Sequence, residues 1–331
     1  MLPVTAYSAL LQGAFGNFDA IVGTLASTAP LVLGGLSVGL AFKAGLFNIG
    51  ARGQFLLGAL GAVAAGITLA GSPSIVAIPL ALLAGFLGGA AWGFIPGLLK
   101  AVAGAHEVVV TIMLNYIADG VITAVVGGPL RQQGRSEAIT PDVGNAALPI
   151  IIGSTGHAGI LLAIIAVVVI GWLLFRTTLG FEIRTVGANP DAARYAGMRP
   201  RVVTILTMSL AGGLAGLAGA VVILGVNHLM TPSFGTTAGF DSIAVALLGR
   251  TNPLGIVAAA LLFGALRSGA TLMEILARIP KELIDVLQAT ILLFLVANPV
   301  LQRLFRLRGV KSGLDTTETL TKTYSGEAVV Q

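Results

Sequence analysis

The stretch RTTLGFEIRTVGANPDAARYAGMRPR, residues 176–201, is polar and basic, whereas both of its flanks are long apolar runs. Its basic residues outnumber its acidic ones, which are Glu182 and Asp191. The basic residues are Arg176, Arg184, Arg194, Arg199 and Arg201. An excess of Lys and Arg is typical of cytoplasmic loops between membrane spans. The stretch therefore predicts a cytoplasmic loop between two transmembrane helices.

Within this loop the sequence predicts a short helix. Asn189 can cap a helix through its side-chain oxygen, and Pro190 suits the first helical position, where an N–H is not needed. Gly197 is placed to end the helix. We expect the helix to run from Asn189 to Ala196.

The motif TLGFEIRTVGANPDAARYAGM resembles the cytoplasmic coupling loop of permease subunits in bacterial ABC importers of the ribose and branched-chain amino acid type. Two further stretches, GLFNIGARGQFLLGA at 45–59 and HEVVVTIMLNYIA at 106–118, resemble the nucleoside branch, which depends on basic membrane lipoproteins. The resemblance covers about residues 4–302 and implies an all-helical polytopic membrane protein with the fold of a type II ABC importer permease.

In that family the loop docks into a groove of an ATPase subunit, so the resemblance implies that ATP and Mg²⁺ are bound by a partner and that this chain binds no cofactor. It also implies a second permease subunit and an extracytoplasmic substrate-binding lipoprotein as partners. The positions that match the docking motif are Gly187, Ala188, Asn189, Pro190, Ala192, Ala193 and Gly197. The alternative is an ordinary basic loop with a small helix, which any membrane protein can have.

The composition independently predicts a protein with several membrane spans. Of the 331 residues 56% are hydrophobic and 10% are charged, and the mean hydropathy is +0.95, outside the globular range. The net charge of +5 does not indicate nucleic-acid binding, because the basic residues are scattered over loop ends and the C-terminal tail. The chain has no cysteine, and His106, His157 and His228 lack metal-ligand spacing. We find no P-loop and no catalytic constellation, so we expect a transport subunit rather than an enzyme.

Eight apolar runs are long enough to cross the bilayer as helices. They are residues 20–42, 47–70, 74–99, 107–127, 158–175, 202–225, 254–276 and 283–301. A ninth run, 240–250, is only about half the required length. If it crosses, most of the nineteen Lys and Arg residues lie in the cytoplasm, as the positive-inside rule requires. We therefore expect nine crossings, one of them short or broken, with the N-terminus outside and the C-terminus inside.

This topology divides the chain into a transmembrane permease domain, residues 1–302, and a basic, polar cytoplasmic tail, residues 303–331. Related permeases often carry one more apolar helix before the AYSALLQGAFG-like segment. We expect either a start that is assigned late or an external amphipathic segment at the N-terminus.

Glycine marks two further features of the membrane domain. In FNIGARGQ, Asn48, Gly50 and Gly53 interrupt an apolar run close to Arg52, which predicts either irregular backbone beside the transport path or a cytoplasmic turn before an ordinary helix. The stretches 85–93 and 211–220 repeat small residues every three or four positions, which lets helices approach closely. This packing is expected within one bundle, or else at an interface with a second permease subunit.

Two polar segments, 128–157 and 226–239, are predicted to form the external surface. The family resemblance implies that this surface receives the substrate-loaded binding protein; the alternative is plain solvated loops. Ionisable residues inside the predicted spans are Asp119, Arg267, Glu274 and Asp285, and the last two lie near external span ends, where an interfacial position explains them.

Candidate substrate contacts are polar residues that can bond a sugar hydroxyl and aromatic residues that can stack on a base. The polar candidates are Asn48, Asn115, Asp119, Asn227 and Asp241, and the aromatic ones are Phe47, Tyr116 and Phe240. Each can instead be a satisfied structural group. The resulting hypothesis is an ABC importer permease for nucleosides or a related small polar solute, working by alternating access. The alternatives are a ribose, simple-sugar or branched-chain amino acid permease, an ion-coupled secondary transporter, or, as the weakest, an intramembrane enzyme.

Overall fold

The computed structural model describes residues 2–234 and 237–304, and the chain is almost entirely helical over them. In this part of the chain seven helices are long and apolar enough to cross a membrane. They are α2 (Phe18–Lys43), α3 (Ala51–Thr68), α4 (Ser74–Ala103), α5 (Glu107–Gly127), α6 (Gly159–Arg176), α9 (Pro200–Val222) continued by η2 (Ile223–Asn227), and α11 (Pro253–Ala277). The chain is therefore a multi-pass membrane protein.

The predicted count of nine crossings is not confirmed by these seven helices. The short run 240–250 forms α10 (Ala238–Leu248), an apolar helix of 11 residues, and the last run forms α12 (Glu282–Leu304). Neither is among the seven. Residues 305–331, which include most of the predicted basic tail, lie outside the described part of the chain.

Helix α3 begins at Ala51, four residues after the predicted start, because the chain leaves the helical conformation after α2. Gly45 adopts φ +70°, and its N–H donates to the Phe42 carbonyl while the Leu46 N–H donates to the Ala41 carbonyl. This bond pair is the Schellman arrangement that ends helices at a left-handed glycine. Residues 44–50 consequently form an irregular connection between two membrane helices.

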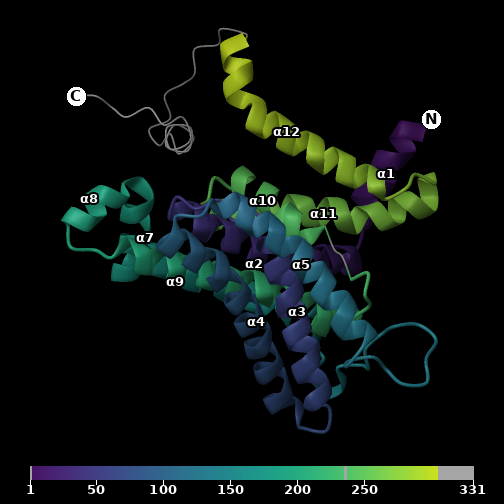
Figure 1. The fold of residues 1–331 in the computed structure, drawn as a ribbon. Helices are drawn as coiled ribbons and strands as arrows, with labels where there is room; N and C mark the ends of the chain where they lie inside the picture. The colour runs from purple at the N-terminus through teal and green to yellow at the C-terminus, as the bar shows by residue number, and fades with distance from the viewer. Residues whose placement is uncertain (1, 235–236, 305–331) are drawn as a thin grey trace.

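Helix α2 lies in the interior of the bundle and packs against α9, α10 and α11 (Figure 1). Helices α4, α5 and α6 lie at its outside, since each buries only a minority of its apolar window. Their exposed side chains include Leu83, Met113, Ile164 and Val168. Such apolar faces suit contact with lipid or with another membrane helix.

The two glycine-rich stretches pack against each other within this bundle, as the first of the two expectations had it. Gly89 of α4 faces Gly216 of α9 so closely that a Cβ added to Gly89 would lie 2.7 Å from the Gly216 Cα. Gly93 meets Gly212 in the same way, at 3.0 Å. Contact of backbone with backbone along one face explains why these positions are glycine.

The connection after α5 folds back on the end of α9. It contains η1 (Gly144–Ala146) and a small hairpin of β1 (Ile150–Ile152) with β2 (Gly156–His157). The Leu148 N–H donates to the Leu224 carbonyl in η2, a π-helix, and the Val143 N–H donates to the His228 carbonyl. The segments 128–157 and 226–234 thus form one surface, which lies at the opposite end of the molecule from α8 (Figure 1).

The N-terminal segment forms α1 (Leu2–Phe15), which the span predictions did not include. It packs on α11 through Ala6, Ala9 and Leu10, and it leaves Tyr7 and Leu11 exposed. The uncovered face is apolar, so the amphipathic character expected of this segment stays a prediction. Its external location stays a prediction.

Candidate functional site

The loop 176–201 contains two helices, α7 (Thr178–Ala188) and α8 (Pro190–Tyr195). The predicted boundaries of the short helix are confirmed: the Asn189 Oδ1 accepts from the N–H groups of Asp191 and Ala192, both at 3.0 Å, and Pro190 is the first helical residue. Gly197 follows with φ +82°. Helix α7 was missed, although Thr177 caps it by accepting from the Gly180 N–H.

The two helices present five of the seven docking-motif residues outward, and Ala193 and Gly187 are the exceptions. Ala193 is fully buried in this chain's own core, so it is not free to enter a partner. Gly187 also faces inward, where an added Cβ would clash with the Lys43 carbonyl. Tyr195 is instead 95% exposed, the most of any large apolar side chain in the described residues. The other motif positions are exposed: Ala188, Asn189, Pro190, Ala192 and Gly197.

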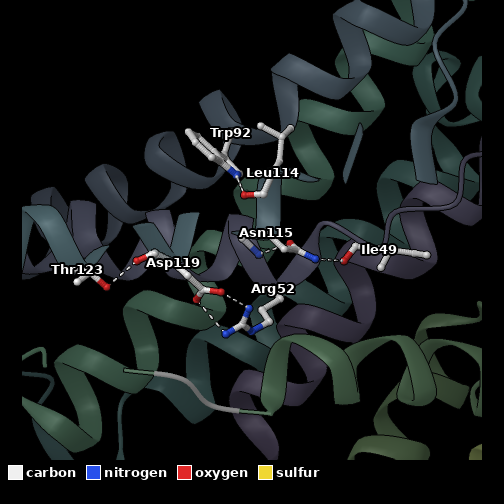
Figure 2. Close-up of polar contacts among 8 residues, drawn as sticks. Ile49, Arg52, Trp92, Leu114, Asn115, Asp119 and Thr123 are labelled. Carbon is white, nitrogen blue, oxygen red and sulfur yellow. Dashed lines mark hydrogen bonds and ion pairs between the residues drawn. The ribbon is translucent and has the colours of Figure 1, made fainter. Parts of the chain in front are cut away.

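A polar cluster joins the start of α3 to the middle of α5. Arg52 forms two bonds with Asp119, Nη1 to Oδ2 at 2.6 Å and Nη2 to Oδ1 at 2.9 Å (Figure 2). The Arg52 side chain is 22% exposed and that of Asp119 is 40% exposed. The sequence indicated only that Arg52 lies close to the irregular stretch, and it did not indicate Asp119 as its partner, because the two residues are 67 positions apart.

The asparagine one turn before Asp119 holds the break between α2 and α3. The Asn115 Nδ2 donates to the Ile49 carbonyl at 3.1 Å, and its Oδ1 accepts from the Gly53 N–H at 2.8 Å (Figure 2). Asn48 is 1% exposed and exchanges two amide hydrogen bonds with Gln54. These contacts favour the structural alternative for Asn48 and Asn115.

A second ion pair, Asp241–Arg267, is linked to the first through Phe240. The Arg52 guanidinium lies 5.5 Å from the centre of the Phe240 ring, and the adjacent Asp241 faces Arg267, with 3.5 Å between Oδ2 and Nη1. Asp241 also accepts from the Thr237 hydroxyl at 2.9 Å. Two ion pairs, one between α3 and α5 and one between α10 and α11, are thus linked by the contact of Arg52 with Phe240, and together they form the polar cluster.

The remaining predicted residues are exposed or make other contacts. Glu274 and Asp285 are exposed, and Asn227 is exposed at the end of η2; the interfacial position of the two carboxylates stays a prediction. Phe47 packs on Phe42, with 4.9 Å between ring centres. Tyr116, on α5, is 70% exposed.

The cluster lies deep along α5. Asp119 follows Glu107, the first residue of that helix, by twelve positions, about 18 Å of helix axis. A partly exposed carboxylate cannot stably face hydrocarbon at that depth, so its open side belongs to water or to another protein. Asp119 keeps free acceptor capacity toward that side, and Phe240, 46% exposed, contacts the Arg52 guanidinium with its ring. The polar cluster therefore offers hydrogen-bond acceptors and an aromatic ring at partly exposed positions.

Comparison with known proteins agrees with this architecture. Residues 20–296 match the family described as branched-chain amino acid transport system / permease component. The guanosine ABC transporter permease protein NupP of Bacillus subtilis is 39% identical over 299 residues, which are 89% of this chain and 86% of that protein. The nucleoside ABC transporter permease protein NupB of Lactococcus lactis is 38% identical over 311 residues, 91% of this chain and 85% of the relative.

A third relative, the glucose ABC transporter permease protein TsgB13 of Haloferax volcanii, is 34% identical over 317 residues, 91% of this chain and 82% of that protein. No solved structure matches the chain. The family match covers most of the sequence, and the relatives are transport components that do not carry the name of an enzyme. The chain thus belongs to the branched-chain amino acid transport system / permease component family, as a multi-pass transport subunit.

Proposed function

We propose that this chain is the permease subunit of an ATP-driven ABC importer that moves nucleosides into the cytoplasm. The single observation that carries the proposal is that two relatives, 39% and 38% identical over about nine-tenths of the chain, are permeases named for guanosine and for nucleosides. The subunit lies in the bacterial inner membrane and pairs with a second permease subunit. Two ATPase subunits bind ATP and Mg²⁺, and an extracytoplasmic lipoprotein delivers the substrate.

The polar cluster supplies the substrate path in this proposal. Asp119 can accept hydrogen bonds from ribose hydroxyls, and Phe240 and Tyr116 offer aromatic faces to a base. Arg52 and Arg267 neutralise the two aspartates, so that an uncharged solute meets a site without net charge. A loosely held substrate is an advantage here, because a tightly bound one would not be released.

In this proposal the ATPase subunits drive the conformational change of the permease. Helix α8, with Tyr195 exposed at its end, docks on the ATPase subunit, and closure of the ATPases displaces α7 and α8 together. Alternating access follows when this displacement changes the packing of the helices around the cluster. Residues 1–302 act as the permease domain, and 303–331 as a cytoplasmic tail.

The test is uptake of labelled guanosine by cells that express this permease with the binding protein and ATPase encoded beside it. Saturable uptake that unlabelled nucleosides compete away, and that disappears with an ATPase unable to hydrolyse ATP, is the expected result. Uptake that survives loss of the ATPase and collapses with the ion gradient would instead assign a secondary transporter.

A sugar is the second candidate substrate, because a relative 34% identical over 91% of the chain is named as a glucose permease. The same uptake assay distinguishes a nucleoside substrate from a sugar substrate. Competition by glucose or ribose but not by guanosine would contradict the nucleoside assignment while leaving the importer mechanism intact.

A further inference from the structure

The irregular segment 44–50 contacts the α7–α8 region on one side and the polar cluster on the other. It is the only connection between α2 and α3, and it holds no regular helix in the described structure. Its two sets of contacts are made by different residues, so each can be broken alone.

On the first side the contact is between bare backbones. A Cβ added to Gly187, in the last turn of α7, would clash with the Lys43 carbonyl and would lie 2.8 Å from the Ala44 carbonyl carbon. A Cβ added to Gly45 would lie 3.1 Å from the Gly187 oxygen. With no side chain between them, a displacement of α7 cannot be absorbed by rotamer changes at this point.

On the second side the contact is made by hydrogen bonds. The Asn115 side chain donates to the Ile49 carbonyl and accepts from the Gly53 N–H. It therefore holds the segment in place at its junction with α3. Arg52 lies between these two backbone groups and reaches Asp119, one turn further along α5. A shift of residues 44–50 along α5 therefore changes the geometry of the Arg52–Asp119 pair directly.

We propose that Gly45 and Gly187 are positioning residues through which a displacement of α7 and α8 reaches the Arg52–Asp119 pair and alters its exposure to the substrate path. This inference rests on the proposed function, because it needs an ATPase partner to move α8. The route is a contiguous chain of contacts, and only a measured coupling between its two ends establishes it.

A reporter at the far end of the route provides the test. Thr123 is exposed one turn beyond Asp119 and donates to the Asp119 carbonyl at 2.9 Å. The chain has no cysteine, so Thr123→Cys gives it a single thiol for a small water-soluble maleimide, and the label is counted on this chain after it is separated from its partner subunits. The labelling rate is measured in the complete transporter, first without nucleotide and then trapped with ATP and vanadate.

We expect trapping to change the labelling rate of the Thr123→Cys transporter by about fivefold, the low end of allosteric coupling factors. Adding Gly187→Ala should abolish this change while the ATPase still copurifies. Gly171→Ala is the matched control, since an added Cβ on this α6 glycine has nothing within 4 Å, and it should leave the change intact. A merely structural contact would alter stability in the Gly187→Ala protein but not the response to trapping.

Retention of the full change in the Gly187→Ala protein overturns the inference, as does the absence of any change in the Thr123→Cys parent. If Gly187→Ala does not accumulate, Gly45→Asn takes its place, because Asn tolerates the left-handed backbone at φ +70° but places a side chain against Gly187. A parent transporter from which the ATPase does not copurify would contradict the proposed function itself.

Discussion

At the scale of single residues, the Arg52–Asp119 pair joins the chemistry of the site to its architecture. Two bonds of 2.6 and 2.9 Å hold the start of α3 on α5. The pair is partly exposed, so its electrostatic contribution is smaller than that of a fully buried pair. Its value lies in fixing where the carboxylate of Asp119 stands in the proposed path.

We predict that Asp119→Ala lowers nucleoside uptake about tenfold or more, because it removes the acceptor and leaves Arg52 without its partner, at a cost of about 1–3 kcal/mol. Glu274→Ala, at an exposed carboxylate, is the control and should transport normally. Radiolabelled uptake is compared after the amounts of assembled protein are matched. Equal transport by the two variants would remove Asp119 from the path.

A second residue-scale prediction concerns His157, which is 1% exposed on β2. Burial, and then the positive charge of nearby His228, lower the pKa of His157 below its ordinary value of 6.5. Because the unfolded chain binds the proton more readily, the contribution of neutral His157 to stability is present above pH 6.5 and is lost as the pH falls toward the lowered pKa.

We therefore expect the melting temperature of the detergent-solubilised protein to fall between pH 7.5 and pH 5, and this fall should be smaller in His157→Gln. His106→Gln, at an exposed histidine, is the control and should keep the fall of the parent protein. Two ionisable residues act on the hairpin: His228 acts electrostatically on His157, and the Oδ1 of Asp19 accepts from the Ser154 hydroxyl. An unchanged pH dependence in His157→Gln would assign the effect to another group.

At the scale of elements, helix α8 has the ends that the sequence predicted, but Ala193 is buried where the motif suggested a docking residue. The Asn-Pro start and the glycine stop were readable from the sequence because capping depends on neighbouring residues. Which alanine of α8 faces inward depends on the angle between α7 and α8. Tertiary packing, and not the local sequence, sets this angle. The sequence motif therefore located the helix but misassigned Ala193.

The predicted docking residue is consequently Tyr195. Truncation to Tyr195→Ala should weaken copurification of the ATPase by roughly tenfold or more, the range of aromatic contacts at interfaces. Tyr195→Phe, which keeps the ring, should retain most of the binding. Ala193→Arg should fail to accumulate, because the site is buried in this chain. Normal ATPase binding by Tyr195→Ala would contradict docking through this residue.

The pairing of α4 with α9 gives a stability prediction at the same scale. Gly89→Ala forces a Cβ against Gly216 and should lower the melting temperature, since overpacking a tight contact costs about 1–3 kcal/mol. Gly127→Ala, where an added Cβ has nothing within 4 Å, should not lower it. Equal melting temperatures of the two variants in the same detergent would mean that the helices separate at little cost.

At the scale of the whole molecule, most span positions were predictable, because apolar length is a local property of the sequence. The depth of the polar cluster was not, since Arg52 and Asp119 are brought together only by the packing of α3 on α5. The number of crossings also stays a prediction, because it depends on whether α10 and α12 cross the membrane.

The topology makes a direct prediction for impermeant thiol labelling of a chain with no native cysteine. Glu137→Cys, on the segment after α5, should label from outside intact cells. Tyr195→Cys and Arg250→Cys should label only after permeabilisation, because Arg250 follows α10 and lies inside if α10 crosses. Labelling of Arg250→Cys from the same side as Glu137→Cys would show that α10 is re-entrant.

The π-turn at η2 ends the helix that α9 begins. The His228 N–H donates to the Ile223 carbonyl, five residues back, whereas in an α-helix it would occupy the Leu224 carbonyl. That acceptor is instead left for the Leu148 N–H. We expect deletion of one residue from 223–227 to restore α-helical bonding there, so that a second donor competes with the Leu148 N–H for the Leu224 carbonyl. The hydrogen bond between Leu148 and Leu224 thus depends on the one extra residue of the π-turn. We therefore expect residues 223–227 to tolerate a change of side chain better than a change of length.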